Sequence, residues 1–389
     1  MRIEKFKSGI YVNQDDYKTF KPTFINEVWE WGDTEINTLL EEASRELGGL
    51  NSFSDLIPNI DVYIKMHTKT EANKSSKIEG TKTSIEEDLL RIDDIAPERR
   101  DDHEEVQNYI IALNYGIDRI AKDDFPLCNR LICEIHAKLL QGVRGKHKTP
   151  GEFRRSQNWI GGTMPSDALY VPPNILDMPD LMSDFEKLIN NDEIKVPHLI
   201  KIALLHYQFE TIHPFLDGNG RIGRLIIPLY LLSKGVLDKP CFYISDYFEK
   251  NRDAYYEALN RVRTRNDLRH WIKFFLTASI YTAKTAKAKF KKVVTLVNEL
   301  NKEVLDIKGK PDNAMRVLDA FYDNPILSSN ELQKITKLTQ PTVDSAINGM
   351  LKKDILREIT GYSRNRIYAL HRYFDIFAIE EKENSKNLF

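Results

Sequence analysis

The hydrophobic positions of this chain recur mainly with the period of an α-helix. Before residue 213, one helical face carries apolar residues three or four positions apart: Leu199, Ile202, Leu205, Phe209 and Ile212. Similar patterns predict helices over residues 34–47, 61–79, 84–90, 104–120, 127–140, 178–189, 197–212, 222–229 and 252–262, with further helix through residues 282–292. The pattern therefore predicts a mainly α protein.

Glycines and a capping pattern set some of the expected helix ends. Gly48-Gly49 predicts the end of the first helix, and Gly80 predicts the end of the second. Ser84 and Glu87 have the spacing of a capping box, in which each side chain satisfies a backbone N–H of the other, so a new helix is expected to begin there.

Two segments lack the helical period. Residues 1–60 include short β-rich pieces, and residues 142–174 contain five glycines and four prolines. Within the second segment, strand-like pieces at 158–160 and 168–171 flank a glycine-rich turn. We expect a surface hairpin over residues 158–171, and an ordinary surface loop is the alternative.

The C-terminal part reads as a separate module. Helical patterns at 314–322, 329–335 and 340–352 precede a strand-like pair, 356–360 and 366–370, that brackets Gly361-Tyr362. This order of elements is that of a winged helix, which we expect over residues 311–372.

Composition and charge narrow the class of protein. The 389 residues are 41% hydrophobic and 29% charged, with a net charge of −2, so two or three domains are expected, without an overall attraction to nucleic acid or membrane. The three cysteines, Cys128, Cys133 and Cys241, form no CxxC pair. The N-terminal residues resemble no signal peptide, and no run approaches about 18 apolar residues. These features predict a cytoplasmic protein.

Residues 213–224 read HPFLDGNGRIGR and allow two interpretations. Gly218, Gly220 and Gly223 spell the dinucleotide fingerprint, GxGxxG. That pattern is informative only between a strand and a helix of a βαβ unit, whereas helical periodicity precedes it here. The dinucleotide interpretation is therefore disfavoured.

The same residues suit the binding and transfer of a phosphate group. The backbone N–H groups of Gly218, Asn219 and Gly220 at a helix start can bind an anion. Arg221 and Arg224, three positions apart, can reach that anion too. Asp217 beside phosphates indicates a Mg²⁺ ligand. His213 is the candidate proton acceptor, so the set predicts transfer from a nucleotide to a hydroxyl. A capped helix after a solvated loop is the alternative.

Residues 213–224 also resemble the motif of the Fic family, HxFx(D/E)GNGRxxR, at every specified position. Members are mostly α-helical enzymes that usually move AMP from Mg-ATP onto a Ser, Thr or Tyr hydroxyl of a target protein. The resemblance implies that His213 deprotonates the hydroxyl and that Asp217 holds Mg²⁺. It implies a phosphate site formed by Gly218, Asn219, Gly220, Arg221, Ile222, Gly223 and Arg224. It also implies that the hairpin at 158–171 is the flap that aligns the target.

The segment after the motif offers candidates for binding adenine and ribose. Tyr247, Asn251, Tyr255 and Tyr256 lie at helical spacings, where an aromatic ring can stack on a purine. Of these, Asn251 and Tyr256 are the predicted nucleotide-binding residues. The alternative is that this aromatic stripe belongs to the core.

Residues 75–80, Ser-Ser-Lys-Ile-Glu-Gly, place an acid where a helix disfavours it. Glu79 falls in the last turn before Gly80, where the helix dipole costs an anion about 0.3–1 kcal/mol. Lys77 cannot relieve this cost, because residues two positions apart do not face each other on a helix. We therefore expect a cation from elsewhere in the chain near Glu79.

The same six residues resemble the inhibitory motif of the Fic family, (S/T)xxxE(G/N). The resemblance implies that Glu79 pairs with Arg224, occupies the place of the terminal phosphate and prevents productive ATP binding. Ser75 would help to hold the helix in place. Some members also use this glutamate to position water and remove AMP. A solvated glutamate at an exposed helix end is the alternative.

The expected domains are an N-terminal region at 1–103 with the inhibitory motif, a Fic catalytic domain at 104–290 and the winged helix at 311–372. In the winged helix, basic residues suited to phosphate contacts are Lys352, Lys353, Arg357, Arg364, Arg366 and Arg372. Asp344 in the reading helix would repel DNA. A second hypothesis is thus an ATP-sensing, DNA-binding regulator. The sequence names no target protein and leaves open a homodimer.

Overall fold

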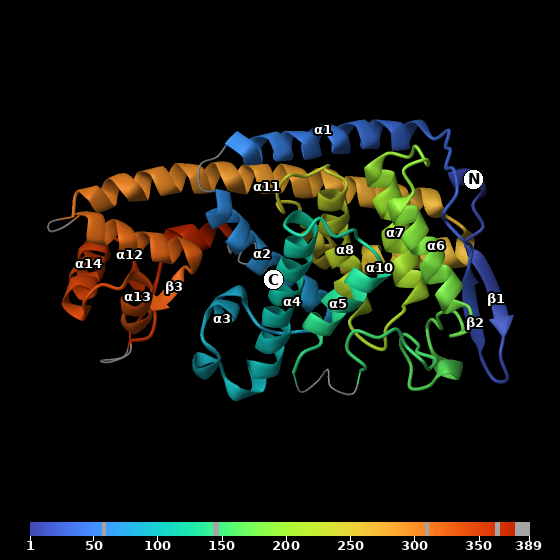
Figure 1. The fold of residues 1–389 in the computed structure, drawn as a ribbon, viewed down its shortest axis with the longest axis horizontal. Helices are drawn as coiled ribbons and strands as arrows, with labels where there is room; N and C mark the ends of the chain where they lie inside the picture. Colours follow the sequence, from blue (N-terminus) through green and yellow to red (C-terminus); the bar gives the residue numbers. More distant parts are fainter. Residues whose placement is uncertain (57–59, 143–147, 308–310, 362–365, 378–389) are drawn as a thin grey trace, which may run out of the picture. The chain divides into compact units, whose positions relative to one another are not determined.

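The computed structural model describes residues 1–56, 60–142, 148–307, 311–361 and 366–377, and most of them are helical (Figure 1). The chain divides into two compact units. The first unit comprises residues 1–54, 74–82 and 104–284, and the second comprises residues 55–73, 83–103 and 285–389. The prediction of a mainly α fold is confirmed.

The N-terminal elements include a hairpin of strands and four helices, with these bounds: β1 (Gly9–Asn13), β2 (Lys18–Pro22), α1 (Thr34–Leu56), α2 (Ile60–Glu79), α3 (Ile85–Leu89) and α4 (Arg100–Ala121). The helices that follow are α5 (Asn129–Leu139), α6 (Met178–Asn190), α7 (His198–Ile212), α8 (Asn219–Ser233), α9 (Ser245–Lys250), α10 (Arg252–Arg265) and α11 (Leu268–Leu305). β1 and β2 pair in antiparallel register, from Gly9 opposite Pro22 to Asn13 opposite Lys18.

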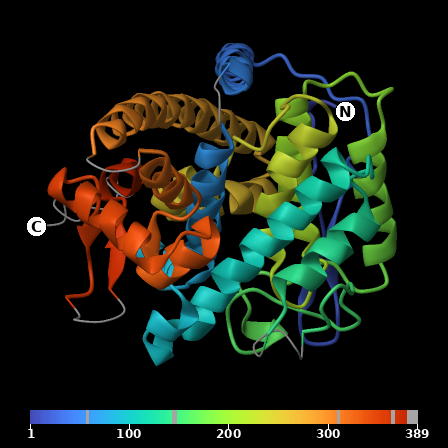
Figure 2. The same ribbon diagram turned by 60° about the vertical axis from the view of Figure 1, so that its left-hand side comes forward.

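α7 is the central helix of the first unit. Fourteen of its fifteen residues are buried, from Leu199 to Ile212, because other helices cover several of its faces. It packs between α6 and α8, and α5 packs against α8 as well (Figures 1 and 2). α7 and α8 are therefore fixed on either side of the loop that joins them, which contains residues 213–218.

Two predicted helix boundaries have opposite outcomes. The expected end at Gly48-Gly49 is wrong, because α1 continues to Leu56. A glycine inside a helix costs only about 1 kcal/mol, and the burial of Leu47 and Leu50 outweighs that cost. The end at Gly80 is confirmed, with a positive φ of 110° that favours glycine. The Ser84–Glu87 capping box is also confirmed.

The expected hairpin at 158–171 is reduced to a single β-bridge between Ile160 and Tyr170. The Ile160 N–H donates to the Tyr170 carbonyl at 2.8 Å, and a short 3₁₀ helix, Pro165–Asp167, lies between the two residues. Gly161 and Gly162 adopt φ values of 71° and 72°, which turn the chain out of the extended form immediately after the bridge. The two expected strands are therefore not present, although their ends pair. We keep the name flap for residues 158–171.

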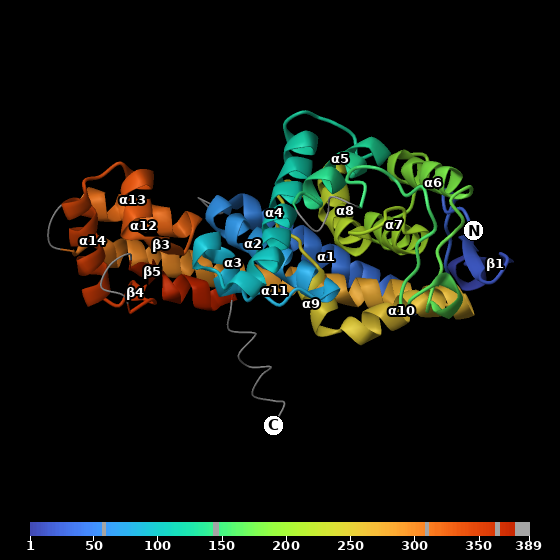
Figure 3. The ribbon, with the colours of Figure 1, turned by 90° about the horizontal axis from the view of Figure 1, so that it is seen from below.

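The second unit ends in helices and a small sheet with the bounds α12 (Pro311–Asp323), β3 (Ile326–Ser328), α13 (Ser329–Thr336), α14 (Gln340–Lys352), β4 (Arg357–Glu358) and β5 (Ile367–Ala369). The three strands are antiparallel in the order β3-β5-β4 (Figure 3). The three predicted helices are confirmed within a few residues. β3 is an additional strand, and Tyr362 and Arg364 lie outside the described residues.

Within the described residues, no helix combines the length and the apolar character needed to cross a bilayer.

Candidate active site

The loop between α7 and α8 turns sharply at both ends. His213 caps α7 in the left-handed conformation, with φ 51° and ψ 60°, and its N–H donates to the Phe209 carbonyl. Gly218 caps the start of α8 with φ 76° and ψ 6°. Glycine adopts this conformation without the steric cost that a side chain would add. The loop between His213 and the first turn of α8 is therefore short and bends sharply at each end.

Side chains on both sides fix the shape of this loop. Asn219 accepts the Phe215 N–H and donates to the Phe215 carbonyl, each at 2.8 Å. The Phe215 ring is fully buried and stacks on His136, with centroids 3.7 Å apart. His136 Nε2 lies 3.0 Å from the Asp217 carbonyl, and His136 Nδ1 accepts the Gly151 N–H at 2.9 Å. The Asn219 side chain thus stabilises the loop through its two bonds to Phe215, and only the backbone N–H of Asn219 is left for a phosphate.

The imidazole of His213 is prepared to accept a proton. Its Nδ1 lies 3.4 Å from the Glu210 carbonyl, so an Nδ1–H directed there leaves Nε2 as the acceptor. Burial lowers the pKa of His213 to about 4, although the Glu210 carbonyl and the charge of Glu79 oppose that shift. The ring is therefore neutral near pH 7, as a general base requires.

The first turn of α8 provides backbone donors for an anion. The N–H groups that begin a helix have no acceptor within it, and the helix dipole makes this end positive. Here the Ile222 N–H makes the first helical bond, to the Gly218 carbonyl at 3.0 Å. The carboxylate of Glu79 lies directly over this turn. A Cβ built on Gly220 would come within 2.2 Å of Glu79 Oε1, so the carboxylate occupies the space beside the expected phosphate donors.

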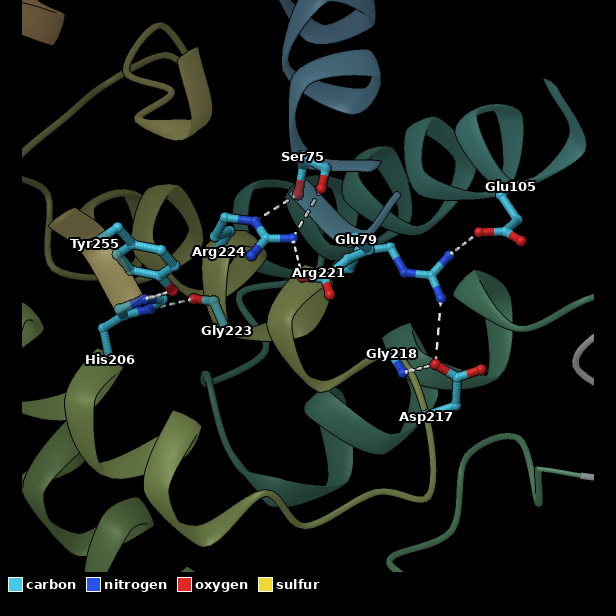
Figure 4. A network of polar contacts seen from close by, with 10 residues as sticks. All are labelled: Ser75, Glu79, Glu105, His206, Asp217, Gly218, Arg221, Gly223, Arg224 and Tyr255. Atoms are coloured by element: carbon cyan, nitrogen blue, oxygen red, sulfur yellow. Dashed lines mark hydrogen bonds and ion pairs between the residues drawn. The ribbon is translucent and has the colours of Figure 1, made fainter. Parts of the chain in front are cut away.

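Arg224 holds this carboxylate and the helix that carries it (Figure 4). Arg224 Nη2 donates to Glu79 Oε1 at 2.7 Å and to the Ser75 carbonyl at 2.8 Å, and Nε donates to Ser75 Oγ at 2.8 Å. The Arg224 side chain is 1% exposed, whereas that of Glu79 is 34% exposed. Burial by itself would raise the pKa of Glu79, but the charge and hydrogen bond of Arg224 hold it below its ordinary value. The predicted pairing of Glu79, Ser75 and Arg224 is present.

Arg221 has different partners from Arg224 in this state. Its Nη1 donates to Glu105 Oε2 on α4 at 2.9 Å, and its Nη2 lies 3.6 Å from Asp217 Oδ1. Figure 4 shows the two guanidinium groups directed to different carboxylates. Sequence reasoning did not identify Glu105, because no local signal distinguishes it from the other acids of residues 101–105.

Asp217 has the properties expected of a Mg²⁺ ligand. Its side chain is 45% exposed, and Oδ1 accepts the Gly218 N–H at 2.6 Å. Among the described residues, Oδ2 contacts no donor or cation, so it is available to a metal. No cluster of three metal-binding side chains is found within the described part of the chain. A Mg²⁺ held here would take its remaining ligands from water and phosphate oxygens, which is its usual coordination in nucleotide sites.

The remaining motif residues face the protein interior. Ile222 is 1% exposed. A Cβ on Gly223 would meet Glu210 Oε1 at 2.1 Å, so this glycine permits α7 and α8 to approach closely. Glu210 is itself buried, and Oε1 has no hydrogen-bond partner among the described residues. Burial raises its pKa to about 7, the charge of Arg224 lowers it, and that of Glu79 adds to the increase.

The aromatic candidates separate into core and surface residues. Tyr255 is buried, and its hydroxyl lies 2.9 Å from His206 Nε2. Tyr256 is 41% exposed, and its pKa is raised by burial first and then by the charge of Glu79. Asn251 joins α9 to α10 and donates to the Tyr247 carbonyl at 2.9 Å. Tyr256 and Asn251 stay available as nucleotide contacts, whereas Tyr255 belongs to the core.

The basic residues of the predicted winged helix are largely paired with acids. Arg357 lies 3.1 Å from Asp354, Arg366 lies 3.7 Å from Glu358, and Lys353 lies 3.7 Å from Asp306. Arg372 contacts two acids, Glu299 and Glu303, each at 2.9 Å. This pairing reduces the positive charge that the module can present to phosphates.

Family models match two consecutive parts of the chain. Residues 37–118 match the model described as "Fic/DOC family N-terminal", and residues 126–231 match "Fic/DOC family". The second match includes the whole loop from His213 to Arg224, and the first includes Ser75, Glu79 and Glu105.

Insect proteins named protein adenylyltransferase Fic are similar to part of this chain. A protein adenylyltransferase Fic of Aedes aegypti is 34% identical over 179 residues, which are 45% of this chain and 32% of that protein. The protein of the same name from Drosophila melanogaster is 31% identical over 179 residues, with the same two shares. The chain spans about a third of the length of the relatives it matches.

Solved structures share the fold at lower identity. A Fic family protein from Desulfovibrio desulfuricans G20 aligns with a TM-score of 0.53 and 20% identity, over 87% of this chain and 96% of that chain. Fic-1, residues 134–508, from C. elegans aligns with a TM-score of 0.54 and 19% identity, over 66% of this chain and 74% of that chain.

Proposed function

This chain is a member of the Fic/DOC family, and from that premise we propose that it is an autoinhibited protein adenylyltransferase. It transfers AMP from Mg-ATP to a Ser, Thr or Tyr hydroxyl of a target protein. The observation that carries the proposal is the short loop that joins the neutral His213 to the first turn of α8, where the carboxylate of Glu79 occupies the place of an anion. The insect relatives named protein adenylyltransferase Fic support the same activity.

The reaction is a displacement at the α-phosphorus of ATP. His213 Nε2 takes the proton of the target hydroxyl as its oxygen bonds to phosphorus. The bond from that phosphorus to the bridging oxygen breaks, and pyrophosphate leaves. The amides of the first turn of α8 and the guanidinium of Arg224 stabilise the phosphate oxygens by hydrogen bonds aimed at their negative charge. Asp217 would hold a Mg²⁺ ion, which neutralises phosphate charge when it is bound.

The bound position of Glu79 supports the autoinhibition. Its carboxylate accepts a hydrogen bond from Arg224 and lies against Gly220. A phosphate of ATP would have to contact these same two residues. Two anions cannot share this space, so ATP binds productively only after Glu79 withdraws. In a related reaction, the same carboxylate would position a water molecule for the removal of AMP from a modified target.

The nucleotide and the target would be held by separate surfaces. Asn251 and Tyr256 would contact the adenosine, and the flap, which keeps one β-bridge between Ile160 and Tyr170, would bind the target backbone by strand addition. We place the enzyme in the cytoplasm, with target and self as protein partners. Self-association as a homodimer is one means by which the position of α2 could be regulated.

The test is mass spectrometry of the purified protein and of a cell lysate after incubation with Mg-ATP. The Glu79→Gly protein is expected to gain the mass of AMP on itself and on a target, and the labelled peptide identifies the acceptor. His213→Ala in the same background is the matched control and is expected to bind ATP without labelling. Labelling that is equal with and without His213 would contradict the proposal.

The C-terminal module is proposed to be a winged helix that mediates protein contacts. Its order α12-β3-α13-α14-β4-β5 supports the winged-helix assignment. A DNA-binding regulator is the weaker hypothesis, because the described basic residues are mostly paired with acids and Asp344 lies in α14. A salt-dependent gel shift by the full chain would favour the DNA-binding role.

A further inference from the structure

Arg154 is a buried cation whose partners are all backbone carbonyls. It is 2% exposed, and within the described residues no carboxylate pairs with it. Its guanidinium donates from Nε to the His213 carbonyl at 3.1 Å, from Nη1 to the Ser156 carbonyl at 3.3 Å and from Nη2 to the Pro173 carbonyl at 2.5 Å. Burial lowers the pKa of Arg154 to about 10, which still leaves the side chain charged near neutral pH.

These three carbonyls belong to separate parts of the proposed site. Ser156 precedes the flap and Pro173 follows it, so a single guanidinium ties both ends of residues 158–171. The third carbonyl is that of His213, the proposed base. The backbone N–H of Arg154 also donates to the Pro214 carbonyl at 2.8 Å, which adds a second link to the same loop.

The His213 backbone requires such support. A residue other than glycine in the left-handed region is uncommon, and the surrounding structure must stabilise it. Besides Arg154, Asn158 Nδ2 donates to the His213 carbonyl at 3.0 Å and to the Phe215 carbonyl at 2.8 Å. The direction of the imidazole is therefore coupled to the residues that begin and end the flap.

We propose that Arg154 is a positioning residue. It joins the flap to the backbone of His213, so that the alignment of the target and the orientation of the His213 imidazole depend on each other. This inference rests on the proposed function and concerns how the site is regulated by target engagement. Arginine suits the role because its planar group directs several N–H donors in fixed directions, which the single ammonium of lysine cannot do.

The alternative is that Arg154 only stabilises the fold. The two roles differ in what a substitution changes. A residue that only stabilises the fold would, when replaced, lower thermal stability, ATP affinity and labelling together. A positioning residue would, when replaced, lower the rate of transfer while ATP binding is retained, because the phosphate donors of α8 do not depend on Arg154.

The experiment uses the full chain with Glu79→Gly as the parent. Arg154→Lys and Arg154→Met are compared with Arg155→Lys, a matched control at a neighbouring residue that is exposed and paired with Glu152 at 2.9 Å. ATP affinity is measured by calorimetry, and self-labelling is measured as a single-turnover rate at saturating Mg-ATP. For Arg154→Lys we expect labelling to fall about 10- to 100-fold with ATP affinity within about twofold of the parent, since misplacement of reacting groups lowers rate.

Arg154→Met, which retains no donor, is expected to label more slowly than Arg154→Lys, and Arg155→Lys is expected to match the parent. Labelling by Arg154→Lys at the parent rate would overturn the inference. A loss of labelling that parallels a loss of ATP affinity, or failure of both Arg154 variants to fold, would assign Arg154 to the fold alone and overturn it as well. Absence of labelling in the parent would instead reject the proposed function.

Discussion

Glu79 Oε1 lies 2.7 Å from Arg224 Nη2, although the two residues are 145 positions apart in the chain. Glu79 ends α2, and Arg224 begins the second turn of α8. The acid that the helix dipole disfavours at the end of α2 is thus stabilised by a buried cation from α8. This contact gives each of the two charged groups a partner, and under the proposed function it would close the nucleotide site.

Replacing Glu79 is expected to open the nucleotide site. A hydrogen bond to a charged group contributes about 1.5–3 kcal/mol, so Glu79→Gly should raise ATP-dependent self-labelling roughly 10- to 100-fold. Glu79→Gln keeps an oxygen acceptor without the charge and should give an intermediate rate. Glu257→Gln, an exposed acid on α10, is the control. Equal labelling by wild type and Glu79→Gly would contradict the closed state described above.

Removing the Ser75 hydroxyl should weaken the closed state without abolishing it. Ser75→Ala deprives Arg224 Nε of its acceptor, while the bonds to the Ser75 carbonyl and to Glu79 remain. Loss of one hydrogen bond of about 1 kcal/mol predicts a rise in labelling of about fivefold. Ser76→Ala is the control, because the Ser76 hydroxyl is buried without a partner in the described residues. A similar rise from Ser76→Ala would indicate general loosening of α2 instead.

The pH dependence of transfer should reflect a neutral His213. Burial lowers the pKa of His213 to about 4, so its ring becomes protonated, and activity is lost, only as the pH falls toward that value. In Glu79→Gly, kcat/KM for labelling should change less than about twofold between about pH 8 and pH 6. A histidine with an ordinary pKa near 6.5 would lose most of its activity over that range. An acid limb near pH 6.5 that persists in Glu210→Gln would show this expectation to be wrong.

Glu210 should make the stability of the protein depend on pH. Burial raises its pKa from 4.5 to about 7, so the folded state binds the proton more tightly than the unfolded state. The stabilisation is complete below about pH 4.5 and is lost as the pH rises through about 7, with a difference on the order of 3 kcal/mol. Unfolding free energies of wild type and Glu210→Gln, measured without ATP across this range, should diverge accordingly. If the unfolding free energies of the two proteins changed in parallel with pH, a buried, protonated Glu210 would be excluded.

Local chemistry predicted several features of this protein from the sequence. The helical period, the glycine at 80 and the Ser84–Glu87 box act over a few residues, so their outcomes matched the structure closely. The resemblance carried by residues 213–224 and 75–80 supplied the candidate site and the glutamate that pairs with Arg224. Each of these signals depends on neighbouring residues and needs no knowledge of the tertiary fold.

Other predictions failed or were incomplete for two different reasons. The burial of Leu47 and Leu50 in the core carried α1 through Gly48-Gly49, whereas the local backbone conformation, with positive φ values at Gly161 and Gly162, limited the flap to one bridge. A periodic pattern shows which side chains are apolar. It does not show whether the free energy gained by burying them exceeds the cost of a residue, such as glycine, that disfavours the helix.

The sequence by itself determined which groups the candidate site contains: a histidine, an aspartate, two arginines and a glutamate. Only the tertiary structure decided their partners, with Arg224 on Glu79, Arg221 on Glu105, and Arg154 on the His213 carbonyl. The physical reason is that a buried cation takes whichever acceptors the packed helices bring within hydrogen-bond distance. That choice depends on elements far apart in the chain, and no local pattern encodes it.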